Sequence, residues 1–136
     1  MKPDIWKDCA WGYLYFNVLD YPENPSEKQK QRAKRFFGNL LVPCENCQVE
    51  YENYIKDNPV NDYTVSCRNN LVKWLCDFRN NINTRLGKSA CSYDDIIDPY
   101  IKNIQKAYQS NFYNYLYCIV LIVVIVMVGI IILNKL

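Results

Sequence analysis

Apolar residues recur every three to four positions along most of the chain, which is the spacing of one face of an α-helix. This pattern predicts a first helix over residues 5–19, ended by the proline-containing turn 21–25. Ser26 and Gln29 predict a capping box for a second helix, because a side chain of each type can bond the other residue's backbone. The apolar stripe of this second helix continues to Leu41.

The middle of the chain continues in the same helical rhythm. A third helix is expected over residues 44–56, followed by a polar loop over 57–65. Ser66 is expected to cap a fourth helix, and Gly87 to end it, because a glycine tolerates the left-handed conformation common after a helix. No stretch shows the alternation of a strand.

A fifth helix is expected to begin at a second capping box, Ser92 with Asp95. The side chains expected to face inward are Ile96, Ile97, Tyr100, Ile101 and Ile104. Several short helices joined by short loops indicate a compact helical architecture. The predicted fold class is therefore all-α: a four-helix bundle with a short fifth helix, followed by one C-terminal transmembrane helix.

The last predicted helix has a different character, because the eighteen residues 116–133 read LYCIVLIVVIVMVGIIIL and carry no charge. At about 1.5 Å per residue they span about 27 Å, enough to cross a bilayer core. A buried core helix is disfavoured, because the segment has no polar face. We expect a soluble domain at 1–108, a juxtamembrane segment at 109–115 and a membrane span at 116–133. The aromatic residues of an interfacial belt are Phe112, Tyr113, Tyr115 and Tyr117.

The N-terminal region does not resemble a secretory signal, because its first twenty residues contain Lys2, Asp4, Lys7 and Asp8 and no clean apolar run. Three residues, 134–136, follow the span. The sequence therefore predicts a single-pass tail anchor with the domain facing the cytosol. Basic residues near the span are few, so the charge rule orients it only weakly.

Charge and composition exclude several functions. The 136 residues include 16 basic and 14 acidic side chains, a net charge of +2, which argues against nucleic acid as a partner. There is no histidine, which excludes a Ser-His-Asp triad, a Cys-His pair and a histidine-ligated metal. The seven cysteines are many for a chain of this length and direct attention to sulfur chemistry.

The sharpest local motif is Pro43-Cys44-Glu45-Asn46-Cys47 at the start of the third predicted helix. Two cysteines three residues apart can close a small disulfide, and a helix N-terminus stabilises a thiolate. A redox-active pair is the first interpretation. A zinc site would need two further cysteine or carboxylate ligands, and a thioredoxin-like domain would need a strand before the motif. No metal site is predicted.

A longer stretch, WLCDFRNNINTRLGK over residues 74–88 with Cys91 after it, resembles the signature of the Erv/ALR family of FAD-linked sulfhydryl oxidases. Upstream, Trp11, the Tyr21–Ser26 turn and the Cys44/Cys47 motif follow in that family's order. The resemblance covers roughly residues 5–100. The residues of this motif and the small size of the chain are most similar to those of family members from large DNA viruses.

The resemblance implies a helical bundle that holds FAD at its mouth, usually as a homodimer. It places Cys47 against the flavin and Cys44 where an incoming dithiol exchanges, and it pairs Cys76 with Cys91 as a structural disulfide. The residues implied to contact FAD are Trp11, Tyr15, Cys76, Arg79, Asn80, Asn83 and Lys88.

The chain departs from the family at three positions where histidines are usual, now Tyr15, Asp77 and Arg79. Plainer interpretations also stand: the aromatic residues can be core, and the two asparagines can belong to a solvated helix face. Cys9 and Cys67 are left without an assigned partner, and Cys118 lies in the apolar span.

The sequence as a whole therefore predicts a membrane-anchored, FAD-dependent thiol oxidase that forms disulfides in a dithiol protein, for instance a thioredoxin-like or CxxC relay protein, and gives hydrogen peroxide. A viral setting would place it in the host cytoplasm or a virion membrane, as a late protein of virion assembly. The alternatives are a non-enzymatic, disulfide-stabilised membrane adaptor and a membrane-anchored zinc module.

Overall fold

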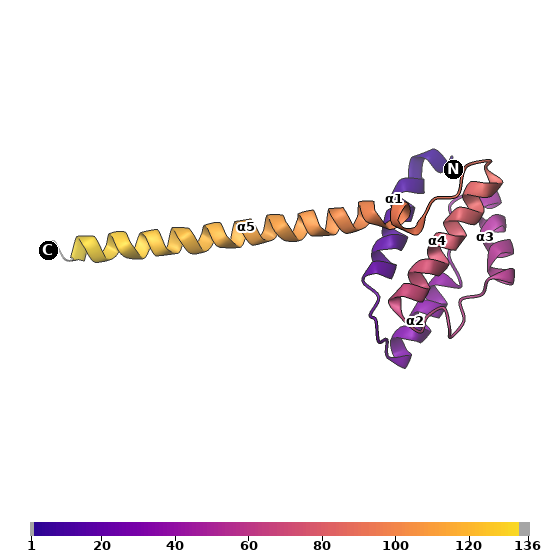
Figure 1. Cartoon of the computed structure of the whole chain (residues 1–136), viewed down its shortest axis with the longest axis horizontal. Helices are drawn as coiled ribbons and strands as arrows, with labels where there is room; N and C mark the ends of the chain where they lie inside the picture. The colour runs from indigo at the N-terminus through magenta and orange to yellow at the C-terminus, as the bar shows by residue number, and fades with distance from the viewer. Residues whose placement is uncertain (1, 134–136) are drawn as a thin grey trace. The chain divides into compact units, whose positions relative to one another are not determined.

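All secondary structure in the part of the chain that the structure describes is helical, as predicted. The computed structural model describes residues 2–133, except the side chains of residues 128, 129 and 131–133; residues 134–136, which the sequence places after the span, lie outside the described residues. The helices, shown in Figure 1, are α1 (Pro3–Leu19), α2 (Glu27–Phe37), α3 (Glu45–Asp57), α4 (Arg68–Arg85) and α5 (Tyr93–Leu133).

The start and stop signals of the helices are mostly those predicted. Ser26 and Gln29 form the expected capping box at α2, and Ser92 and Asp95 bond each other at the start of α5. Gly87 has φ +68°, the left-handed conformation expected after α4. The prediction for Ser66 is wrong: Cys67 is the N-cap of α4 and makes no side-chain cap bond. The Ser66 hydroxyl instead donates to the carbonyl of Tyr63 at 2.8 Å.

Two helix boundaries also differ from the prediction. The second helix ends at Phe37 instead of continuing to Leu41, because Gly38 serves as its C-cap and a Cβ at that position would lie 2.5 Å from the Lys34 carbonyl oxygen. The short fifth helix and the membrane helix are one continuous element, α5, with Pro99 inside it. Pro99 is the seventh residue of α5, where it removes one backbone hydrogen bond, and the helix continues past it.

Residues 2–97 form one compact unit whose core is rich in aromatic side chains. Phe78 of α4 is 5% exposed and lies at the centre of this packing. Its ring centroid is 5.7 Å from Trp11 of α1, 5.8 Å from Tyr51 and 4.8 Å from Tyr54 of α3, and 6.1 Å from Trp74. One side chain therefore joins α1, α3 and α4.

Polar bonds reinforce the aromatic core at its edges. The Trp74 indole donates to the Asn58 carbonyl at 2.9 Å, at the end of α3. The Tyr21 hydroxyl donates to the Val65 carbonyl at 2.9 Å, and Arg68 Nε donates to the Tyr21 carbonyl at 2.6 Å. The turn after α1 is thereby fixed to the start of α4.

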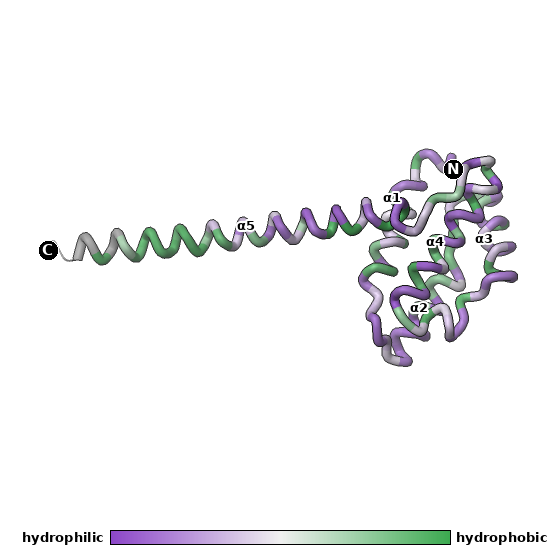
Figure 2. Tube along the Cα trace, viewed as in Figure 1, coloured by the Kyte–Doolittle hydropathy of each residue, from purple (hydrophilic) through white to green (hydrophobic). Residues whose placement is uncertain are grey.

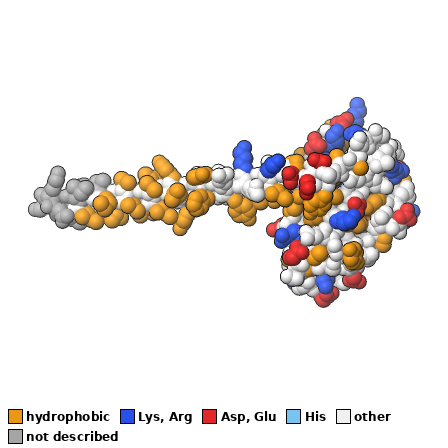
Figure 3. Space-filling view, in the orientation of Figure 1, with side chains coloured by type: hydrophobic (Ala, Val, Ile, Leu, Met, Phe, Trp, Pro, Cys, Tyr) orange, Lys and Arg blue, Asp and Glu red, His pale blue; other side chains and the backbone are white. Residues whose placement is uncertain are grey.

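The second unit consists of the part of α5 after Ile97. Figure 2 shows hydropathy rising along α5, from mixed residues in its first half to a continuous apolar stretch. In the space-filling view of Figure 3, hydrophobic side chains cover the visible face of that stretch. Among the described residues, α5 is the one helix long and apolar enough to cross a membrane, and none of its apolar window is buried.

The position of Phe78 generates a stability prediction. Phe78→Ala should lower the free energy of unfolding of the domain by about 3–5 kcal/mol, because it removes the ring that three helices share and leaves a cavity. Urea denaturation followed by far-UV circular dichroism measures the change. Tyr63→Ala is the control, since Tyr63 is 75% exposed and its loss should cost less than about 0.5 kcal/mol. Equal stability of the two variants would contradict the central role of Phe78.

Candidate active site

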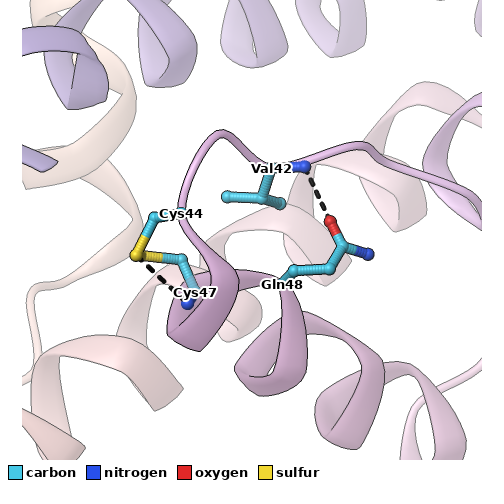
Figure 4. Close-up of a disulfide and its surroundings, with 4 residues drawn as sticks. All are labelled: Val42, Cys44, Cys47 and Gln48. Carbon is cyan, nitrogen blue, oxygen red and sulfur yellow. Dashed lines mark hydrogen bonds between the residues drawn. A yellow bond between two sulfur atoms is a disulfide. The ribbon is translucent and has the colours of Figure 1, made fainter. Parts of the chain in front are cut away.

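The predicted redox motif is a disulfide at the first turn of α3. Cys44 and Cys47 are bonded to each other, with their Cα atoms 5.0 Å apart, and both are partly exposed (Figure 4). Cys44 is the N-cap of α3 and has extended backbone, and its sulfur accepts a hydrogen bond from the Cys47 backbone N–H at 3.4 Å. A disulfide that is partly exposed at a helix start is accessible to a thiol from solvent.

The helix start also decides how the two sulfurs behave after reduction. The unpaired N–H groups of the first helical turn carry partial positive charge, which favours an anion beside them. A thiolate released at Cys47 would therefore be stabilised, and a stabilised thiolate is a good leaving group in disulfide exchange. This property comes from backbone alone and needs no histidine.

Side chains of α3 hold the segment that leads into the disulfide. The Val42 backbone N–H donates to Gln48 Oε1 at 2.7 Å, as Figure 4 shows. The Leu40 N–H donates to the Tyr51 hydroxyl at 3.3 Å, and this hydroxyl donates to the Phe37 carbonyl at 2.7 Å. Tyr51 thus fixes both the end of α2 and the approach to Cys44.

Tyr51 connects the disulfide to the aromatic core. Cys47 and Tyr51 are one helical turn apart on α3, so they share a face. The Tyr51 ring contacts Phe78, which contacts Trp11 of α1. An ion pair between Glu50 and Arg85 further joins the first half of α3 to the last turn of α4.

Three of the predicted cofactor residues are brought together by α1 and α4. The Trp11 and Tyr15 rings are stacked with centroids 5.9 Å apart. The Arg79 guanidinium carbon lies 5.3 Å from the Trp11 ring centroid and 5.6 Å from that of Tyr15, which is cation–π geometry. Asp77, two residues before Arg79 on α4, instead pairs with Lys73 at 2.8 Å.

Cys76 belongs to the same cluster but is buried. Its side chain is 4% exposed, and burial raises the pKa of its thiol to about 11. A hydrogen bond with the Tyr15 hydroxyl acts in the opposite direction on that pKa and is the smaller effect. The thiol therefore stays protonated and unreactive at neutral pH.

Asn80, Asn83 and Cys91 form a second group. The Asn80 side-chain amide makes two hydrogen bonds to the Cys91 backbone. Its Nδ2 donates to the Cys91 carbonyl at 2.9 Å, and its Oδ1 accepts from the Cys91 N–H at 3.0 Å. Asn83 Nδ2 lies 3.9 Å from the Cys91 sulfur. These asparagines therefore fix the loop after α4. Lys88 is exposed at that loop, and its backbone N–H donates to the Asn83 carbonyl at 2.9 Å.

The Cys76–Cys91 disulfide is not formed in this structure, in which both thiols are free. Cys76 and Asn80 are one turn apart on α4, and Asn80 holds the Cys91 backbone, so the two cysteines lie in the same region. The pairing stays a prediction. Cys9, Cys67 and Cys118 are also free thiols.

The cluster fits a flavin dinucleotide by the chemistry of its groups. The partly exposed Trp11 ring and the Arg79 guanidinium over it offer stacking to a ring system and charge to a phosphate, whereas the Tyr15 ring is fully buried. Within residues 2–133, by contrast, no three His, Cys, Asp or Glu side chains gather in the manner of a metal site.

Several notable residues could not be singled out from the sequence. The Trp6 indole N–H is buried and has no hydrogen-bond partner within the described part of the chain, yet in the sequence Trp6 looks like any apolar helix position. The ion pair of Glu50 with Arg85 joins residues far apart along the chain, so no local pattern announces it. Leu41, expected to be buried in the second helix, is 93% exposed.

Comparison with known proteins agrees with this geometry. The model of the Erv1/Alr family matches residues 8–109. A probable FAD-linked sulfhydryl oxidase of Acanthamoeba polyphaga mimivirus is 32% identical over 114 residues, covering 82% of this chain and 80% of that protein. An FAD-linked sulfhydryl oxidase of African swine fever virus is 26% identical over 103 residues, covering 74% and 84%.

A solved structure shares the fold. The crystal structure of the FAD binding domain of Erv1 from Saccharomyces cerevisiae superimposes with a TM-score of 0.65 at 25% identity. The similarity covers 74% of this chain and 94% of that one. The helices that carry the disulfide and the aromatic cluster thus have a counterpart in a known flavin-binding domain.

Proposed function

The chain belongs to the Erv1/Alr family, and from that membership we propose that it is an FAD-linked sulfhydryl oxidase, which forms disulfide bonds in protein substrates. The observation that carries the proposal is the Cys44–Cys47 disulfide at the start of α3, partly exposed and adjacent to the aromatic packing of α1 and α4.

The exchange is a pair of thiol–disulfide steps. A substrate thiolate attacks the Cys44 sulfur, the Cys44–Cys47 bond breaks, and Cys47 leaves as a thiolate at the helix N-terminus. The second substrate thiolate attacks the mixed disulfide and releases Cys44. The substrate is oxidised by two electrons to a disulfide, and the cysteine pair is reduced by two electrons to the dithiol, with the protons taken up from solvent.

The roles of the two cysteines follow from their surroundings. Cys44 adjoins the exposed Leu41 segment, where a protein substrate can reach it. Cys47 shares a face of α3 with Tyr51, whose ring contacts Phe78 within the core. Cys44 is therefore assigned to the substrate and Cys47 to the side of the cofactor.

FAD, when bound, accepts the electron pair from the reduced cysteines and delivers it to oxygen, giving hydrogen peroxide. Trp11 would provide a stacking face and fully buried Tyr15 would support the Trp11 ring, while Arg79 and Lys88 would provide positive charge toward its phosphates. Asn80 and Asn83 would act by holding the Cys91 loop. Buried Cys76, which bonds Tyr15, would form part of the inner lining of the cofactor site.

The domain plan assigns residues 1–108 to an oxidase domain with four bundled helices, 109–115 to a juxtamembrane aromatic segment and 116–133 to a membrane span. The domain is placed on the cytosolic side, which Lys102 and Lys106, within about 15 residues of the span, favour only weakly because they are few. Its substrate is a dithiol protein, and the family resemblance implies a homodimer. The viral relatives support a virion or host membrane as its location.

The redox assignment is tested by single substitutions in the full chain. Cys44→Ser and Cys47→Ser should each reduce oxidation of a dithiol substrate at least a hundredfold, because each removes one of the two sulfurs that exchange. Oxygen consumption measures turnover, and flavin absorbance checks that FAD is still bound. Cys9→Ser is the matched control and should keep wild-type turnover. Normal rates in either active-site variant would contradict the mechanism.

The pairing of Cys76 with Cys91 is tested on oxidised protein by peptide mapping without reduction, which should find these two peptides joined. Closing this loop of fourteen intervening residues is worth roughly 3 kcal/mol, so the double Ser variant should unfold more easily yet keep turnover. After reduction, Cys76 should alkylate far more slowly than exposed Cys9 at pH 8, and faster as the pH approaches about 11, because only the thiolate reacts. Cys76 joined to a different cysteine would rule the pairing out.

The membrane topology is tested by protease treatment of intact membranes that carry the full chain. A domain on the cytosolic side should be digested without detergent, because the protease reaches it directly. A domain that is protected until detergent is added would be lumenal, and its substrates would then belong to a secretory compartment. Alkaline extraction of the same membranes checks that residues 116–133 anchor the chain.

A further inference from the structure

Leu41, three residues before Cys44, presents both its side chain and its backbone to solvent. It is 93% exposed, more than any other large hydrophobic residue that the structure describes. Within residues 2–133, neither its N–H nor its carbonyl takes part in a hydrogen bond. A leucine in this state leaves apolar surface and two backbone groups facing water, so all three are available to another molecule.

The residues on both sides of Leu41 are held in place. Tyr51 binds the Leu40 N–H and Gln48 binds the Val42 N–H, so the segment does not need to be ordered when a partner arrives. A pocket of about 280 Å³ opens beside it. The residues that line this pocket include Leu40, Leu41, Gln48, Tyr51, Glu52 and Ile55.

We propose that the segment Leu40–Val42 is the docking edge for the protein substrate: an extended stretch of the dithiol protein pairs its backbone with Leu41 and places an apolar side chain on Leu41 and the adjoining pocket. This inference rests on the proposed oxidase function. The substrate must bring a cysteine to Cys44, and this edge is continuous with Cys44 along the chain. Strand addition to a free backbone edge is a common way to bind peptides without a fixed sequence.

The free backbone groups of Leu41 can be satisfied in two ways, which differ in how many substrate residues they use. In an antiparallel pair, one residue exchanges both its N–H and its carbonyl with a single residue opposite, whereas a parallel pair spreads the bonds over neighbours. Leu41 is the residue of this segment with both groups free, because Val42 and Leu40 use their N–H groups internally. Antiparallel pairing satisfies both groups with one substrate residue, whereas parallel pairing needs two, so the proposal takes the antiparallel arrangement.

Antiparallel pairing also fixes the order of the substrate's residues. The residue opposite Leu41 must come later in the substrate than the cysteine that meets Cys44. The Cys44 N–H bonds the Val42 carbonyl at 2.8 Å, so the chain turns at Pro43 and the distance to Cys44 is shorter than three extended residues. The apolar residue is therefore two or three positions after the attacking cysteine.

Acidic residues near the docking edge should make the protein prefer basic substrate segments. Glu45 and Glu52 are exposed beside the disulfide and the pocket, and Glu50 is paired with Arg85. Substrate segments that carry basic residues next to the cysteine should therefore react faster than acidic ones, and the difference should shrink as salt is added.

The test measures kcat/KM of the full chain, in detergent with FAD bound, toward unstructured dithiol peptides and toward dithiothreitol. A peptide with leucine two or three positions after the attacking cysteine should react about tenfold faster than one with leucine the same distance before it. Leu41→Ser should remove this advantage, mainly through KM, and leave dithiothreitol oxidation unchanged. Tyr63→Ser is the control, because Tyr63 is also a largely exposed hydrophobic residue, at 75%, but bonds the start of α4 through its carbonyl.

A second measurement requires no change in the protein. Methylating the backbone nitrogen of the peptide residue opposite Leu41 removes a donor and should lower kcat/KM about tenfold, whereas methylating the next residue should not. Equal rates for both leucine positions, or no effect of Leu41→Ser on peptides, would overturn the proposal. So would a Leu41→Ser variant that sediments as a smaller species, since Leu41 would then contact a second copy of the chain. Failure of wild-type protein to oxidise dithiothreitol would instead contradict the oxidase function itself.

Discussion

The packing of Phe78 is the interaction on which the rest of the domain depends. Its ring touches side chains from α1 and α3 as well as its own helix, and those two helices carry different halves of the chemistry. α1 presents Trp11 and Tyr15, and α3 presents the disulfide one turn before Tyr51. A small domain has little core with which to hold such groups in register, so a few large rings that each bury much area are an efficient solution.

Local signals predicted most of the fold. Capping boxes at Ser26 and Ser92 and the glycine at 87 operate within a few residues, and the structure has all three. The predicted extent of α2 was wrong, because the apolar periodicity of the sequence continues past Gly38. The helix ends there, and Leu41 lies in solvent. Hydrophobicity predicts burial on average and cannot reveal a residue exposed for contact with a partner.

The candidate site was predictable in part. The two cysteines of the motif could be found because their spacing and helix start have a direct chemical meaning. The adjacency of Trp11 and Arg79 could be expected only through the family resemblance, since these residues are 68 positions apart along the chain. The hydrogen bonds of Asn80 to the Cys91 backbone and the ion pair of Glu50 with Arg85 are long-range pairings that no periodicity encodes.

Arg79 lies over two aromatic rings in a chain that has no histidine. A guanidinium keeps its charge at every physiological pH, whereas an imidazole at the same place would gain and lose a proton between about pH 5 and 8. Apart from the cysteines, the electrostatic environment of the site is therefore the same in an acidified vesicle as in neutral cytoplasm. The pH dependence of such an enzyme would therefore come from the thiols that exchange, which must react as thiolates, and the cofactor side of the site would add no imidazole titration to it.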